Sequence, residues 1–253
     1  MNLLLTYHRL CEPSYPESER DFYTIPRDVF CRQMECLSVN GLSPLDTAMI
    51  RTTLPAGAQR CFLCFDDGTA DHYEIAFPVL EELGMRATFF VPTIKLDRPG
   101  HLTRGQIREM AAAGHIIGCH SHKHERIDEL TAPEVAEQID TSVQILADAT
   151  GLAPWIFAPP GGFTNANVLA AATRAGLEVV RTMRWGFNHH PNLQALETIP
   201  LTRHTTEKQF RKILQGKSSP IQYAGKEAIK TILPTRAYEI FRATVFRLRR
   251  KRT

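Results

Sequence analysis

The chain has 253 residues, of which 43% are hydrophobic and 23% charged, a composition that suits one large globular domain with a buried core. A formal net charge of +3 is too small to indicate a nucleic-acid partner, and no apolar run is long enough to predict a membrane-spanning helix. The first residues lack the basic start and long apolar run of a secretory signal, so we expect a cytoplasmic protein.

Strand-like and helix-like segments alternate along most of the chain. Strands are expected at residues 3–7, 61–65, 87–91, 115–119, 155–157, 178–182 and 198–201. Helices are expected directly after Pro26 and at 72–83, 103–114, 131–150, 167–174 and 207–214, with residues 9–26 as a loop. Capping boxes open the helices that follow Thr103 and Thr131.

This alternation, with short turns, predicts parallel strands wrapped by helices. We expect a distorted β/α barrel of about seven strands over residues 1–225, and an open doubly wound sheet is the second choice. The six cysteines show no metal-binding or pairing pattern, which favours a reducing compartment.

The expected strand ends carry polar and reactive side chains. In β/α barrels, reactive groups collect at the carboxyl ends of the strands. Here those ends carry Tyr7-His8, Asp66-Asp67, Pro92, His120, the run 159–162, Arg184-Trp185 and Arg203-His204. The sequence therefore predicts an active site at this end of the barrel.

Two adjacent carboxylates, Asp66 and Asp67, follow the strand 61–65. Neighbouring carboxylates repel each other, so the pair needs a metal, another cation or a shared proton beside it. Asp-Gly is also an ordinary turn signal, and an isolated Asp-Asp-Gly would be interpreted as a turn.

The second informative stretch is His120-Ser121-His122-Lys123-His124, directly after a strand. His120 and His124 are four residues apart, and with one carboxylate from Asp66 or Asp67 they form a ligand set typical of catalytic zinc. The alternative is a solvated loop rich in histidine. His122 should point away from its neighbours, and we leave it out of the ligand set.

These two stretches resemble the polysaccharide deacetylases of carbohydrate esterase family 4. Phe65-Asp66-Asp67-Gly68 and His120-Ser121-His122-Lys123-His124 match that family's FDDG and HSxxH patterns, and the similarity covers residues 3–205. The resemblance implies a distorted β/α barrel and hydrolysis of N-acylated sugars. It also implies a divalent metal, usually zinc with Co²⁺ or Ni²⁺ as alternatives, held by Asp67, His120 and His124, and Asp66 as the general base.

The next motif both matches the family and departs from it. The run 158–162, Ala-Pro-Pro-Gly-Gly, resembles the family's RPPYG, and by position the N–H of Gly161 stabilises the oxyanion, with an ordinary loop as the alternative. The family's base-orienting arginine is Ala158 here, and the aspartate of the following motif is absent from the run 181–185. We expect a rearranged site in which Arg181, Arg184 or Arg203 replaces that arginine.

The remaining candidates are less specific. His204 is the nearest match to the family's histidine that protonates the leaving amine, with a loop histidine as an equal alternative and His189 and His190 as weaker rivals. Trp185 could stack on a sugar or pack in the barrel rim, and His8 could line the substrate site or be structural.

The tail differs in character from the barrel. Residues 226–253 carry nine Lys or Arg against two Glu, a charge of +7, with apolar residues at helical spacing. This pattern suggests a basic amphipathic helix on an anionic membrane surface, and a surface helix over the barrel is the alternative.

The function that we expect is metal-dependent removal of an N-acetyl group from an amino sugar. The substrate would be a surface polysaccharide, a lipopolysaccharide or a lipid-linked precursor, and the enzyme would be peripheral at the inner face of the membrane if the tail binds there. The alternatives are a metal-free ring-amide hydrolase and a non-catalytic carbohydrate- or membrane-binding barrel.

Overall fold

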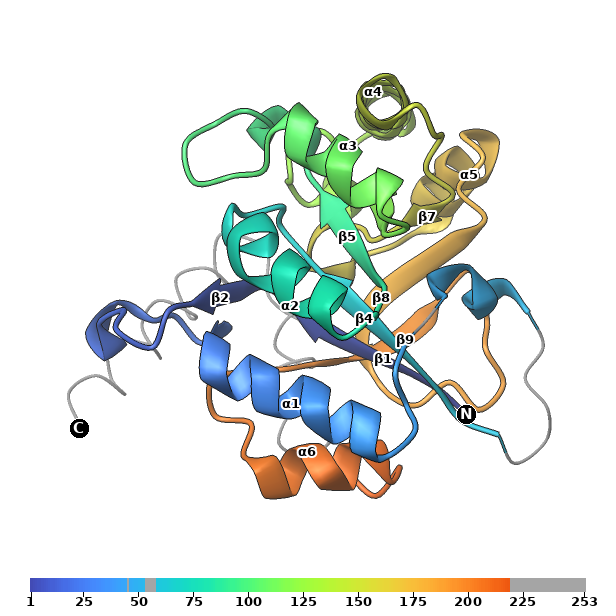
Figure 1. Cartoon of the computed structure of the whole chain (residues 1–253). Helices are drawn as coiled ribbons and strands as arrows, with labels where there is room; N and C mark the ends of the chain where they lie inside the picture. The colour runs from blue at the N-terminus through green and yellow to red at the C-terminus, as the bar shows by residue number, and fades with distance from the viewer. Residues whose placement is uncertain (45, 53–57, 219–253) are drawn as a thin grey trace. The chain divides into compact units, whose positions relative to one another are not determined.

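The computed structural model describes residues 1–44, 46–52 and 58–218 (Figure 1). Its compact unit, Met1–Lys217, is built around seven parallel strands that close into a barrel in the order β1-β4-β5-β6-β7-β8-β9. The strands are β1 (Asn2–Tyr7), β4 (Arg60–Phe65), β5 (Ala87–Val91), β6 (Ile116–Cys119), β7 (Ile156–Phe157), β8 (Val179–Trp185) and β9 (Leu196–Pro200). The predicted barrel is confirmed, and the open sheet was the wrong alternative.

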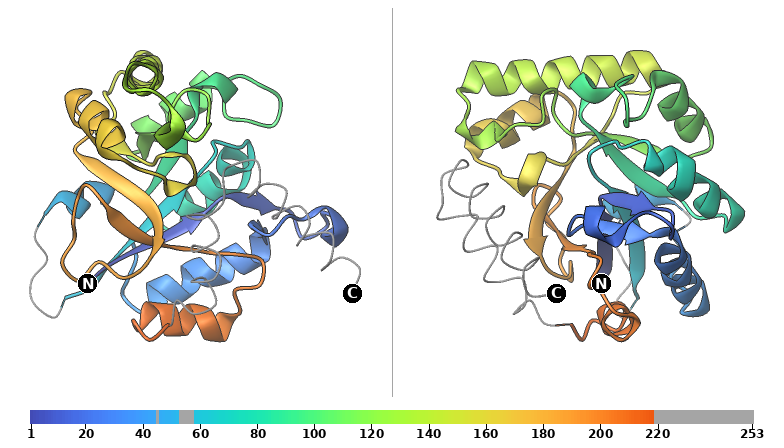
Figure 2. Two further views of the ribbon diagram at one scale, coloured as in Figure 1. Left: turned by 180° about the vertical axis from the view of Figure 1, so that it is seen from behind. Right: turned by 90° about the vertical axis from the view of Figure 1, so that its left-hand side faces the viewer.

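Helices pack around the outside of the barrel (Figure 2). They are α1 (Arg27–Val39), α2 (Phe77–Glu82), α3 (Arg104–Ala112), α4 (Ala132–Thr150), α5 (Ala166–Arg174) and α6 (Glu207–Leu214). Thr103 and Thr131 form the predicted capping boxes at α3 and α4. Across the described ranges, no helix combines the length and apolar character needed to cross a bilayer.

Two apolar clusters separate the inside of the barrel from its outer layer. Strand residues such as Leu4, Phe62, Phe90 and Val179 form the smaller cluster, which fills the barrel interior. The larger cluster contains the intervening strand residues together with helix residues, so it lies between the barrel and its helices. This division follows from the two-residue period of the strands.

Apart from shifts of one or two residues at element ends, the structure departs from the prediction most clearly in three places. The segment 9–26 is not all loop, because β2 (Arg9–Cys11) and β3 (Thr24–Pro26) pair in parallel as a small separate sheet. The helix expected over 72–83 begins with a π-helical turn, η3 (His72–Ala76), before α2. Strand β8 continues past 182 to Trp185, which the charged residues in it had obscured.

Two further expectations concern the cysteines and the tail. All six cysteines are free, in agreement with the absence of a pairing pattern. The boundary at 225/226 and the tail 226–253 lie outside the described residues and stay predictions.

Candidate active site

The three predicted metal ligands meet at the carboxyl end of the barrel. Asp67 follows β4, and His120 and His124 follow β6. The Oδ1 atom of Asp67 lies 2.7 Å from Nε2 of His124 and 3.5 Å from Nε2 of His120. One ligand atom from each residue lies within 4.8 Å of the other two. One carboxylate oxygen and two imidazole nitrogens at this spacing fit a divalent cation such as zinc.

The backbone orients the first of these histidines. Nδ1 of His120 donates a hydrogen bond to the carbonyl oxygen of Ala158, just beyond β7. Because a carbonyl only accepts, Nδ1 carries the proton, and Nε2 faces Asp67 as a potential ligand. Metal-binding histidines are commonly oriented in this way. His122, by contrast, bonds through Nδ1 to the Thr93 hydroxyl at 2.9 Å, which agrees with its omission from the ligand set.

The backbone turns sharply at the same residues. Asp67, Ser121 and His124 have φ angles of 78°, 59° and 61°, and they are three of the four described non-glycine residues in the left-handed region. Such a conformation costs about 1–3 kcal/mol per residue and is concentrated at functional sites. The turn at Asp67 lets the two adjacent carboxylates meet different partners, because Asp67 contacts the histidines whereas Asp66 contacts β8.

Asp66 is held by a buried arginine. Nη2 of Arg181, on β8, donates a hydrogen bond to Oδ1 of Asp66, and the guanidinium lies 4.9 Å from the centre of the Phe90 ring. The Arg181 side chain is fully buried and that of Asp66 is 4% exposed. Burial alone would raise the pKa of Asp66, but Arg181, with His120 and His8, lowers it below its usual value. Asp66 is therefore ionised at neutral pH and able to accept a proton.

Of the three arginines expected to substitute for the one missing at position 158, Arg181 is the one that contacts Asp66. Strands β7 and β8 pair with Phe157 opposite Val180, so the same register carried one residue further sets Arg181 beside the fully buried Ala158. The other two candidates lie elsewhere. Arg184 is exposed and bonds the Ala195 carbonyl, and Arg203 bonds the Arg20 carbonyl.

The carboxylate of Asp67 is also ionised. Burial alone would raise the pKa of Asp67, but the neighbouring imidazoles of His120 and His124 hold it well below its usual range. A carboxylate must be ionised to bind a cation, so this protonation state suits Asp67 to a metal site.

His8, predicted only to line the substrate site, lies beside the Asp66 carboxylate. Its Nε2 atom is 3.9 Å from Oδ2 of Asp66, and its ring stacks on Tyr23 with centroids 4.4 Å apart. Burial lowers the pKa of His8 even though Asp66 and Asp67 oppose this effect, so the imidazole is neutral at neutral pH. The signal for this contact was the parallel pairing of β1 with β4, where Tyr7 lies opposite Phe65 and the next residues are His8 and Asp66.

The other predicted histidines, His189, His190 and His204, are all exposed. The ring centroid of His204 lies 5.8 Å from that of Phe22, and the role of His204 as proton donor stays a prediction. His189 and His190 are exposed beside Asn188, which pairs with Asn2 at the opposite, amino end of β1. The position of these two histidines removes them as rivals for the proton donor.

The glycine pair after β7 forms a tight turn against β8. Gly161 is exposed with φ 66°, and within the described residues its N–H makes no hydrogen bond. A Cβ on Gly162 would lie 2.1 Å from the backbone nitrogen of Met183, so only glycine fits there. The oxyanion role of Gly161 stays a prediction that this open N–H suits.

Trp185 ends β8 and is half-buried, with its ring edge-on to Phe187 at 5.2 Å. It also packs against the larger apolar cluster, which accounts for its position without a ligand. A sugar-stacking role for Trp185 stays a prediction.

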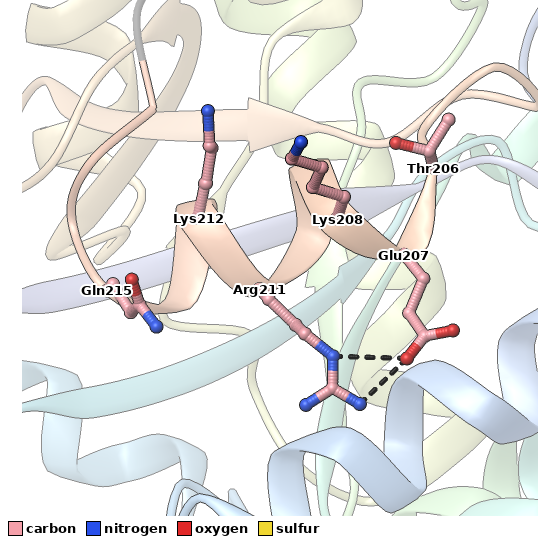
Figure 3. A pocket seen from close by; sticks show the side chains of 6 residues that line it. All are labelled: Thr206, Glu207, Lys208, Arg211, Lys212 and Gln215. Atoms are coloured by element: carbon pink, nitrogen blue, oxygen red, sulfur yellow. Dashed lines mark hydrogen bonds and ion pairs between the residues drawn. The ribbon is translucent and has the colours of Figure 1, made fainter.

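A separate hollow lies along α6 (Figure 3). It is lined by Thr206, Glu207, Lys208, Arg211, Lys212 and Gln215, with an ion pair of 2.7 Å between Arg211 and Glu207. None of the predicted site residues lines this hollow, so the candidate chemistry stays at the strand ends.

Known proteins match the part of the chain that carries Asp66, Asp67, His120 and His124. The family model described as polysaccharide deacetylase matches residues 54–180, about half of the chain, including both aspartates and both histidines. The chain belongs to the polysaccharide deacetylase family. This membership confirms the resemblance inferred from the two motifs.

Individual relatives support the same assignment. The protein YxkH of Bacillus subtilis (strain 168) is 29% identical over 180 residues, which cover 70% of this chain and 62% of YxkH. The peptidoglycan-N-acetylmuramic acid deacetylase PdaA of the same organism is 30% identical over 124 residues, covering 47% of this chain and 44% of PdaA. The chain therefore spans less than two thirds of the length of either deacetylase-family relative.

A solved structure shows the same fold. The deacetylase PplD from Streptococcus pyogenes, solved in complex with acetate, superimposes with a TM-score of 0.76 at 23% identity. The match covers 86% of this chain and 98% of PplD. At this identity the similarity establishes the barrel fold shared within the deacetylase family.

Proposed function

We propose that the protein hydrolyses the N-acetyl group of an amino sugar within a polysaccharide or its precursor, releasing acetate and a free amine. The observation that carries the proposal is a division of labour between adjacent residues. Asp67 joins His120 and His124 in a ligand set, whereas Asp66 is a separate ionised carboxylate held by Arg181. Amide hydrolysis needs both an electrophilic centre and a free base.

A divalent cation on Asp67, His120 and His124, with zinc expected and Co²⁺ or Ni²⁺ as alternatives, would polarise the amide carbonyl and acidify the attacking water. Asp66 then accepts the proton of that water, a contribution of roughly 10²–10⁴-fold in rate. Arg181 keeps the carboxylate of Asp66 ionised and fixes its orientation from inside the barrel.

The proton must next reach the amine nitrogen as the carbon–nitrogen bond breaks. We propose His8 as the group that delivers it, because its neutral imidazole lies 3.9 Å from the Asp66 carboxylate and can pass on the proton that Asp66 collects. His204 is the second candidate, from the sequence prediction. The N–H of Gly161 is the proposed donor to the oxyanion.

The substrate class is proposed from the family and from PdaA, whose name places its activity on N-acetylmuramic acid in peptidoglycan. The expected substrates are a surface polysaccharide, a lipopolysaccharide or a lipid-linked precursor. The cytoplasmic location and the contact of the basic tail with an anionic membrane remain proposals from the sequence alone.

A metal-free ring-amide hydrolase is the main alternative, and the complete Asp67, His120 and His124 set argues against it. A non-catalytic barrel is the other alternative, and the ionised Asp66 beside Arg181 argues against that one.

Metal analysis of the purified protein, combined with acetate release from N-acetylglucosamine oligosaccharides and peptidoglycan, tests the proposal. Asp66→Asn should keep its metal and lose acetate release. Asp148→Asn, the same chemical change on the exposed face of α4, is the control and should behave as wild type. Unchanged turnover in Asp66→Asn would exclude Asp66 as the base.

A further inference from the structure

A short segment after the aspartate pair is hydrogen-bonded to the backbone that carries His8. Asp71 and His72 follow Asp66 by five and six residues, at the start of the π-helical turn η3. The Asp71 Oδ2 atom accepts a hydrogen bond of 2.7 Å from the backbone N–H of Leu10. Nε2 of His72 donates a hydrogen bond to the backbone carbonyl of His8. The two side chains therefore hold the backbone at His8 and at Leu10.

His72 is rigidly placed for this contact. It is fully buried, and its ring packs edge-on against Phe65 at 5.3 Å and near Phe89 at 5.8 Å. The carbonyl of His8 can only accept, so the proton of the His72 ring is on Nε2. Within the described residues Nδ1 of His72 has no hydrogen-bond partner. The bond from Nε2 to the His8 carbonyl therefore accounts for a polar ring in this apolar surrounding.

The contact coincides with an unusual start to the helical segment. A π-helical turn carries one more residue per hydrogen-bonded turn than an α-helix and occurs frequently at functional sites. Here that turn begins at the residue whose side chain reaches His8. The backbone of β1 and β4 is joined once more nearby, because the Asp66 N–H donates to the Tyr7 carbonyl at 3.0 Å.

We infer that Asp71 and His72 are positioning residues that fix the His8 imidazole beside Asp66. The inference rests on the proposed function, in which His8 delivers the proton to the leaving amine. One segment of seven residues, 66–72, would then supply the base, one metal ligand and the clamp for the proton donor. A displacement of about 1 Å in such a group can cost roughly 100-fold in rate.

The test compares two substitutions of His72 with a neighbouring control. His72→Met fills the space and removes the N–H donor, whereas His72→Gln retains an N–H at a similar reach. Tyr73→Phe is the control, because that hydroxyl bonds Glu109 on the outer surface. We expect His72→Met to lower kcat about 10–100-fold, with KM and metal content unchanged, and His72→Gln to recover most of the loss.

The double variant His8→Ala, His72→Met separates positioning from general damage. If His72 acts through His8, the substitution at 72 should have no further effect on kcat once the imidazole at 8 is gone. Asp71→Ala removes the second contact and should show the same dependence on His8. It also serves as the test if His72→Met fails to fold.

A readout independent of activity follows the His8 ring directly. The imidazole NMR signal that is lost in His8→Ala should shift in His72→Met and stay in place in Tyr73→Phe. Three results would each overturn the inference. They are wild-type kcat in both His72→Met and Asp71→Ala, a loss of kcat from His72→Met that is as large in the His8→Ala background as in wild type, and an unmoved His8 signal. Absence of acetate release from wild type on every substrate would instead contradict the proposed function. The NMR shift would still test whether His72 positions the His8 ring.

Discussion

The replacement of Arg181 by methionine should cost both stability and activity. Methionine keeps much of the length of the side chain but removes the charge, so Asp66 keeps its burial and loses its main counter-charge. Breaking a buried ion pair by removing one partner costs about 3–5 kcal/mol. The loss in rate is bounded by the whole contribution of the base, roughly 10²–10⁴-fold.

The two effects can be measured separately. Urea unfolding of the metal-free protein gives the free energy of unfolding, and acetate release after metal restoration gives kcat. In the double variant Arg181→Met, Asp66→Asn both charges are gone, so most of the lost stability should return while activity stays absent. Full activity in Arg181→Met would refute the idea that this arginine maintains the base.

A relocation of the arginine gives a stricter test. Since Arg181 lies beside Ala158 in the register of β7 and β8, the variant Arg181→Ala, Ala158→Arg restores a guanidinium from the neighbouring strand. We expect it to recover part of the activity that Arg181→Ala loses. Activity no higher than that of Arg181→Ala would show that the strand of origin matters as well as the charge.

Three further predictions concern the metal, pH and a glycine. Asp67→Asn should lower the metal content of the purified protein, and an unchanged content would remove Asp67 from the ligand set. Burial lowers the pKa of His115, so its contribution to the free energy of unfolding is complete above the unfolded pKa of about 6.5 and is lost as pH falls further, by at most about 1.4 kcal/mol per pH unit. In His115→Gln the free energy of unfolding, measured with urea, should therefore depend less on pH in this range. An unchanged pH dependence would contradict the assignment. Gly162→Ala should lower Tm far more than Gly151→Ala, although φ is 76° and 77° at the two sites, because only the first Cβ strikes the Met183 backbone; equal shifts would contradict the packing argument.

The fold was largely predictable because the helices and strands carry strong periodic patterns. Strand β5 (Ala87–Val91) and helix α6 (Glu207–Leu214) have the predicted bounds. Strands β2 and β3 were missed because three residues are too few for a two-residue period to stand out, and one of them ends in Pro26. The end of β8 was placed at 182 because the charged Arg184 interrupts the apolar pattern, whereas the strand continues to Trp185 with Arg184 exposed.

The site was predictable where its residues are close in sequence. Asp67, His120 and His124 lie in two short motifs, each directly after a strand. The pairing of Arg181 with Asp66 joins residues 115 positions apart, and only the order and register of the strands reveals it. The same holds for His8, which the pairing of β1 with β4 brings to Asp66.

The neighbouring positions of Ala158 and Arg181 have a consequence for how enzymes of this type are recognised. A motif search that demands an arginine before the Pro-Pro pair would classify this chain as inactive, although a guanidinium reaches the same carboxylate. In a closed barrel, side chains from two neighbouring strands can reach the same position in the interior. Loss of a motif residue in a barrel is therefore evidence of inactivity only after the adjoining strands have been searched for a substitute.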